Sequence, residues 1–88
     1  MNITDVRVRL VNKDDSKLKA FASFTIDEVF VVHDVKIIED SNGTFIAMPS
    51  RQSNNGEHHD IAHPLNTETR TTISSAVLAA YEKAKSNQ

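Results

Sequence analysis

The hydrophobic pattern of this chain changes period once, and that change limits the folds open to it. Through the first half, apolar residues alternate with polar ones, which is the period of half-buried β-strands. The last segment instead repeats apolar residues every three or four positions, which is typical of an amphipathic helix. These residues are Ile73, Val77, Ala80, Tyr81 and Ala84. The sequence therefore predicts a β-sheet followed by one C-terminal helix that packs on it.

Two alternating runs near the start predict an antiparallel hairpin. The first is Ile3–Leu10 and the second is Leu18–Ile26, and the polar residues 12–16 between them favour a turn. In the second run Phe21 shares the parity of the polar residues. The polar face of this hairpin can gather four basic side chains, in an arrangement set by the strand register. They are Arg7, Arg9, Lys17 and Lys19.

A second pair of strands is expected to follow. Residues 29–38 are nearly all β-branched or aromatic, which predicts a long strand partly covered on both faces. The dipeptide Asn42-Gly43 favours a tight turn, so residues 44–49 are expected to return antiparallel. Pro49 has no backbone N–H group, and it should therefore end that strand or lie on an edge.

The rest of the chain is expected to hold a loop and the helix. Residues 50–60 are predicted to form a polar loop, and Asn66 or Thr67 can cap the start of the helix with a side-chain oxygen. The predicted order is β-β-β-β-α. This is an α+β fold with an antiparallel sheet of four or more strands, in a single domain over residues 1–88.

Size and cysteine content narrow the class of protein. A chain of 88 residues builds only a thin core, and oligomerisation is one way to add buried surface. The chain has no cysteine, which excludes disulfides, thiol nucleophiles and Cys-ligated metals. The longest apolar stretch, residues 29–33, is too short to span a bilayer. We expect a cytoplasmic protein with no membrane partner.

Charge gives no direct sign of a nucleic-acid binder. The chain has 10 basic and 12 acidic side chains, for a net charge of −2. Phosphate binding needs several Lys or Arg residues on one surface, so any basic surface must come from the way folding arranges these residues.

Few residues suggest catalysis or metal binding. The cluster of His58, His59, Asp60 and His63 has side chains that suit zinc or nickel, but it is interpreted as a solvated loop rather than a metal site. His33 and Asp34 are strand neighbours and are expected to face opposite sides of the sheet, so they should not form a catalytic pair. No Gly-rich phosphate loop or nucleophile motif is present. We therefore expect no enzymatic activity, no cofactor and no small-molecule substrate.

Five segments, in order along the chain, resemble the bacterial stage V sporulation protein G (SpoVG) family. In one-letter code they are LKAFAS from Leu18, FVVHD from Phe30, FIAMPSR from Phe45, DIAHP from Asp60 and AVLAAY from Ala76. The resemblance covers essentially the whole chain. It implies a small cytoplasmic regulator, linked to septation and sporulation, that binds DNA or RNA with sequence preference. It also implies a homodimer joined through strands.

The resemblance further implies which residues lie near nucleic acid. They are Arg51 in the Met-Pro-Ser-Arg block and Lys83 and Lys85 on the helix. Arg7, Arg9 and Lys19 are expected to help if folding or dimerisation brings them to Arg51. His58 and His59 stand where the family usually has an aromatic and a basic residue, and they are expected to bind phosphate more strongly on acidification. Gln52 replaces a second basic residue of the family pattern.

Two functions follow as hypotheses. The first is a homodimeric, nucleic-acid-binding regulator that influences division septum formation and gene expression of the sporulation or virulence type. The second is a protein-interaction module that acts on septation through a protein partner, which the net charge of −2 favours.

Overall fold

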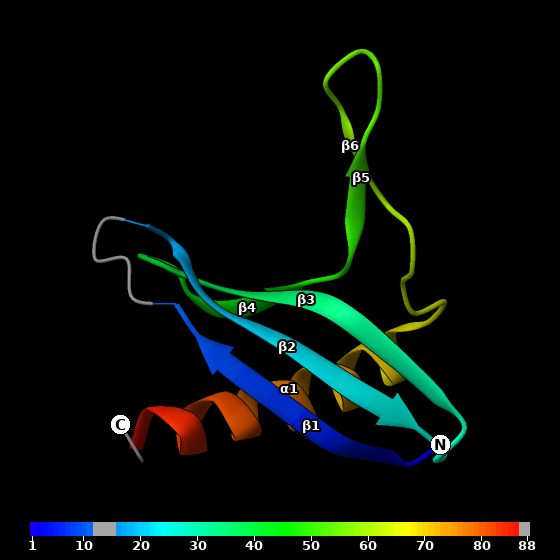
Figure 1. Ribbon diagram of the computed structural model, residues 1–88, viewed down its shortest axis with the longest axis vertical. Helices are drawn as coiled ribbons and strands as arrows, with labels where there is room; N and C mark the ends of the chain where they lie inside the picture. Colours follow the sequence, from blue (N-terminus) through cyan, green and yellow to red (C-terminus); the bar gives the residue numbers. More distant parts are fainter. Residues whose placement is uncertain (12–15, 87–88) are drawn as a thin grey trace.

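Four strands form one antiparallel sheet, in the order in which they follow one another along the chain (Figure 1). They are β1 (Ile3–Leu10), β2 (Leu18–Ile26), β3 (Phe30–Asp40) and β4 (Gly43–Ala47). The computed structural model describes residues 1–11 and 16–86. The turn predicted at residues 12–16 therefore lies, apart from Ser16, outside the described residues. The predicted α+β fold with the order β-β-β-β-α is confirmed by this sheet and by the C-terminal helix.

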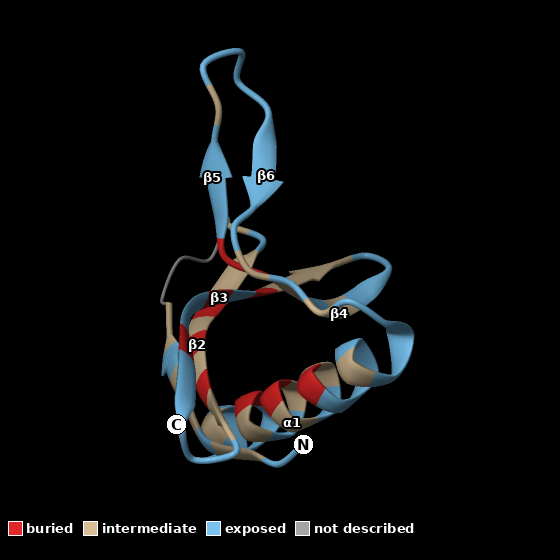
Figure 2. Cartoon of the chain, turned by 90° about the vertical axis from the view of Figure 1, so that its right-hand side faces the viewer, coloured by how far each residue is buried: buried red, intermediate tan, exposed pale blue. Residues whose placement is uncertain are grey.

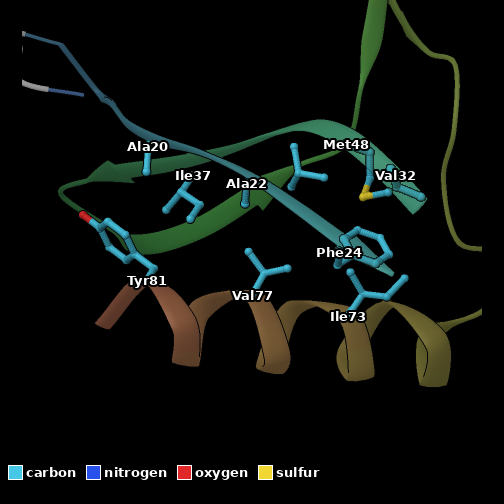
Figure 3. Packing of buried hydrophobic residues seen from close by; sticks show 10 residues of the cluster. Ala20, Ala22, Phe24, Val32, Ile37, Met48, Ile73, Val77 and Tyr81 are labelled. Atoms are coloured by element: carbon cyan, nitrogen blue, oxygen red, sulfur yellow. The ribbon is translucent and has the colours of Figure 1, made fainter. Parts of the chain in front are cut away.

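The helix, α1 (Thr67–Ser86), begins at the cap that the sequence predicts. Asn66 accepts a hydrogen bond at Oδ1 from the backbone N–H of Thr69, at 2.8 Å, and this satisfies one of the free donors of the first turn. Ile73, Val77 and Tyr81 are buried, so the predicted apolar stripe faces the sheet (Figure 3). No helix in the described part of the chain is long and apolar enough to cross a membrane.

The core lies between α1 and one face of the sheet (Figure 2). Ala20 and Ala22 place small side chains in the middle of β2, where Val77 of the helix packs (Figure 3). Ten hydrophobic residues are buried there: Ala20, Ala22, Phe24, Val32, Val35, Ile37, Met48, Ile73, Val77 and Tyr81. The opposite face of the sheet carries the polar residues of β1 and β2, and α1 does not cover it.

Two aspartates in the left-handed backbone region interrupt the strict alternation of the strands. Asp5 has a φ of 49° and lies at a register shift between β1 and β2, and Asp34 has a φ of 63° and lies at a register shift between β2 and β3. Asp and Asn tolerate this region better than most residues do. An extra residue at a β-bulge changes which side chains face the core. Val32 and Val35, three residues apart, are both buried as a result.

The bulge also corrects the expectation that residues 29–38 are partly covered on both faces. Val29, Phe30 and Val31 are exposed at the end of the β2–β3 hairpin, whereas the buried residues of β3 face only the helix. The apolar run therefore has two causes: the bulge shifts which side chains of β3 point to the core, and the hairpin tip carries exposed apolar residues. It does not arise from packing on both faces of the strand.

Residues 50–60 do not form the loop predicted from the sequence. They form a two-stranded antiparallel hairpin, β5 (Ser50–Gln52) and β6 (His58–Asp60), separate from the main sheet. The turn between the strands is closed by hydrogen bonds from the N–H of Gly56 to the carbonyl of Ser53 and from the N–H of Ser53 to the carbonyl of Glu57. Gly56 has a φ of 87°, which glycine adopts without steric cost.

Pro49 lies between the sheet and this hairpin. β4 ends at Ala47, two residues before Pro49, so the strand is shorter than the predicted residues 44–49. The Pro49 carbonyl accepts a hydrogen bond from the N–H of Ile61 at 2.8 Å, which joins the two ends of the hairpin at its base.

Candidate nucleic-acid interface

The hairpin of residues 50–60, called the arm below, projects away from the sheet and helix (Figure 2). All its residues are exposed except Ser53, which is partly exposed, and none contributes to the core. Its two strands hold each other by pairing Ser50 with Asp60, Arg51 with His59 and Gln52 with His58. The arm is therefore a short two-stranded ribbon whose side chains are free to contact another molecule.

Arg51 and His59 lie directly opposite each other on the arm. Side chains at such positions share one face of the ribbon, with Cβ atoms about 4.5–5.5 Å apart. The Nε2 atom of His59 lies 3.6 Å from a carboxylate oxygen of Glu57, and both side chains are largely exposed. The arm therefore places a guanidinium beside an imidazole, with one carboxylate in reach of the imidazole.

A second group of polar residues lies where the arm meets the start of α1. A shallow depression there is lined by His58, His59, Asp60, His63 and Arg70. Arg70 was not singled out from the sequence, because it is an isolated basic residue of the helix. Within residues 1–11 and 16–86, no group of three or more His, Asp or Glu side chains is arranged to hold a metal ion.

Arg7 and Arg9 lie on the uncovered face of the sheet, away from the helix. They line a depression of about 270 Å³, called the sheet-face depression below. The guanidinium carbon of Arg9 lies 5.6 Å from the centre of the Phe21 ring. Lys19 is on the neighbouring strand, where its carbonyl accepts a hydrogen bond from Val11, and it does not line this depression.

His33 and Asp34 both line the sheet-face depression. The expectation that they face opposite sides of the sheet is therefore wrong. The reason is the bulge: Val32 pairs with Phe24 and Val35 with Ala22, so both His33 and Asp34 lie opposite Ser23.

Apart from Lys19, the sequence-predicted site residues thus separate into three groups. Arg51, His58 and His59 are on the arm, and Arg7 and Arg9 are at the sheet-face depression. Lys83 and Lys85 are in the last turn of α1, at the end away from the arm (Figure 1). Lys85 is engaged there, since its Nζ lies 3.9 Å from an oxygen of Glu39 and 3.7 Å from one of Glu82.

Comparison with known proteins places the chain in a family. A family model described as SpoVG matches residues 1–83. A relative in Lachnospira eligens is 60% identical over 85 residues, which is 97% of this chain and 96% of that protein. The chain belongs to the SpoVG family. The SpoVG resemblance read from the five sequence segments is therefore confirmed.

Other SpoVG relatives match over similar lengths. One in Caldanaerobacter subterraneus subsp. tengcongensis is 58% identical over 87 residues, which is 99% of this chain and 94% of that protein. One in Clostridium acetobutylicum is 57% identical over 88 residues, which is 100% of this chain and 92% of that protein. All three carry the name "Putative septation protein SpoVG", which connects the family with septation and cell division.

Proposed function

We propose that this protein is a non-enzymatic, cytoplasmic regulator that binds duplex DNA through the arm and influences septation through gene expression. The observation that carries this proposal is the projecting ribbon with Arg51 opposite His59. The major groove of B-DNA is about 12 Å wide and admits a two-stranded β-ribbon. Several DNA-binding folds use strands in this way.

The side chains of the arm suit both parts of DNA recognition. Arg51 can bind a phosphate or the O6 and N7 atoms of guanine with two hydrogen bonds. Gln52 and Asn54 carry the amide groups that pair with adenine in the major groove. Arg51, Gln52, Asn54 and His59 all line one depression on the arm.

The charge of the arm depends on its histidines. With neutral imidazoles, Arg51 is outweighed by Glu57 and Asp60, and the arm is net negative. Protonation of His58 and His59 makes it net positive. A polyanion should therefore bind the arm more tightly in its protonated form.

We also propose that the chain acts as a homodimer, which presents two arms to DNA. Exposed apolar side chains gather at the tip of the β2–β3 hairpin and before α1: Val29 is 84% exposed, Phe30 62% and Leu65 91%. Phe30 and Leu65 also line a largely apolar depression of about 340 Å³ beside the start of α1. A thin-cored chain gains buried apolar surface if a second copy covers this region.

Titration of labelled duplex fragments of genomic DNA, at several salt concentrations, tests the proposal. Log affinity should fall linearly with log salt, because phosphate binding releases counterions. Arg51→Gln should weaken binding and reduce the slope by about 1. Lys17→Gln removes one exposed positive charge just before β2, outside the arm, and serves as the matched control. Equal losses in the two variants would refute the assignment to the arm.

A second candidate function is a protein-interaction module that acts on septation through a protein partner. The exposed apolar residues at the hairpin tip and the net charge of −2 favour it. In that case the wild type would show no salt-dependent binding to any duplex fragment.

A further inference from the structure

Two rows of side chains cross the uncovered face of the sheet. In the first, Phe21 of β2 lies between Arg9 of β1 and Lys36 of β3, as the register pairs both residues with it. In the second, Ser23 lies between Arg7 and the bulge of His33 and Asp34. The Phe21 ring is thus flanked by a cation on each side. The neighbouring row offers the hydrogen-bonding side chains of Ser23, His33 and Asp34.

The aromatic ring and the guanidinium already contact each other. Arg9 lies over Phe21 at 5.6 Å, and Phe21 is partly exposed at the edge of the sheet-face depression. Among the described residues, no carboxylate lies within ion-pair distance of Arg7, Arg9 or Lys36. These cations are therefore available to a phosphate, while the ring offers a surface on which a flat group stacks.

We propose that the sheet-face depression binds one unpaired base of a single-stranded nucleic acid. The base stacks on Phe21 beside Arg9, and the adjoining phosphates contact Arg7 and Lys36. This is the combination by which sheet surfaces bind single strands: an aromatic platform within a basic surface. The site is on a different face from the arm, and it stands whether or not the arm binds duplex DNA.

Asp34 and Ser23 give the site a preference among bases. The carboxylate of Asp34 accepts hydrogen bonds and repels phosphate, so it favours the part of a base that carries an amino group. Cytosine, adenine and guanine carry an exocyclic amino group, whereas thymine and uracil do not. The Watson–Crick edge that presents this group is accessible only in an unpaired base. The depression therefore selects a single strand over a duplex.

Fluorescence anisotropy with labelled oligomers of about ten nucleotides tests this proposal, since single-strand sites commonly span several nucleotides. The probes are oligo-deoxycytidine, oligo-cytidine and oligo-deoxythymidine. Both cytosine oligomers should bind more tightly than oligo-deoxythymidine. The ratio of the two dissociation constants for the cytosine oligomers shows whether the site prefers deoxyribose or ribose. Asp34→Gly, which suits the positive φ of this position, should abolish the preference for cytosine.

Variants of the two rows locate the site. Phe21→Leu should weaken binding of oligo-deoxycytidine by about tenfold, the order expected for one stacked base. Arg9→Gln, at an exposed position, gives a second test that does not depend on the packing of Phe21. Phe45→Leu is the matched control, because Phe45 is an exposed phenylalanine on β4 outside the depression.

The proposal is overturned if Phe21→Leu and Arg9→Gln both bind oligo-deoxycytidine with wild-type affinity. It is also overturned if Phe45→Leu loses as much affinity as Phe21→Leu. If Arg9→Gln altered only the sedimentation of the protein, the face would be a contact between copies of the chain. Arg51→Gln should lose duplex binding and keep single-strand binding, so the failure of one site is distinguishable from the failure of the other.

Discussion

Tyr81 donates its hydroxyl hydrogen to Oε2 of Glu39 across 3.2 Å, and this bond joins the last part of α1 to the end of β3. Lys85 lies 4.9 Å from the centre of the Tyr81 ring and 3.9 Å from the same oxygen of Glu39. Burial raises the pKa of the Tyr81 phenol, and the nearby Glu39 carboxylate raises it further. The neutral phenol is therefore part of what holds the helix end on the sheet.

This arrangement predicts a loss of stability at alkaline pH. The folded phenol holds its proton more tightly than the unfolded one, whose ordinary pKa is about 10. Its contribution is therefore fully present below about pH 10 and is lost as pH rises through the folded pKa. Tyr81→Phe should cost about 1 kcal/mol at neutral pH, the usual value of one hydrogen bond, and should reduce the alkaline loss.

Urea unfolding of wild type and Tyr81→Phe at a series of alkaline pH values measures this effect. Tyr81 is the only tyrosine in the sequence, so tyrosinate absorbance reports its ionisation directly. Parallel alkaline losses in the two proteins would show that other groups cause the dependence.

Val77→Asp should unfold the protein or dissociate it. Val77 is fully buried between the helix and the sheet, and an unpaired carboxylate there costs several kcal/mol, on the order of the penalty for an uncompensated buried charge. Ala79→Asp makes the same kind of change at an exposed position of the same helix and should be nearly neutral. Thermal unfolding compares the two, and equal melting temperatures would show that the helix face is wrongly assigned.

Affinity for duplex DNA should increase on mild acidification, because a polyanion binds a charged imidazole more tightly than a neutral one. Phosphate favours the imidazolium forms of His58 and His59, so complex formation takes up protons. The other charged and titratable groups around the two rings are Arg51, Glu57, Asp60, His63 and Arg70.

DNA affinity measured at two pH values for the double variant His58→Ala, His59→Ala tests whether these two histidines, and not the neighbouring charged groups, cause the pH dependence. The double variant should bind with little pH dependence, whereas His63→Ala should behave like wild type. A double variant with the wild-type pH dependence would show that the two histidines take no part.

Sedimentation equilibrium should show a dimer, with twice the 9.8 kDa mass of the chain. Phe30→Glu places a charge among the exposed apolar residues at the hairpin tip and should favour the monomer. Phe45→Glu is the matched control, since Phe45 is exposed elsewhere on the sheet. A single 9.8 kDa species for the wild type, at tens of micromolar, would rule the dimer out.

The main sheet and the helix could be predicted because burial leaves a period in the sequence. The stripe of Ile73, Val77 and Tyr81 and the cap at Asn66 are examples, and both are confirmed. The arm left no such period, because none of its side chains is buried. Its strands are held by backbone hydrogen bonds, to which any sequence without proline contributes equally.

The candidate sites were predictable only in part. Arg7 and Arg9 share a parity, which places them together on the uncovered face. Phe21, on the polar parity of its strand, was the available signal for the aromatic part of that face. His33 and Asp34 were misplaced because a bulge depends on the backbone angle of one residue, and an aspartate at that position gives no distinct pattern.

No residue of the arm is buried, and this has a consequence for how relatives of this chain can diverge. Substitutions between Ser50 and Asp60 leave the core untouched, so most of them should change the free energy of unfolding by less than about 0.5 kcal/mol. Selection can therefore act on what the arm contacts without a penalty in folding. Under the proposed function, lineages whose arms bind different DNA sequences need differ only in this ribbon, while the sheet and helix stay the same.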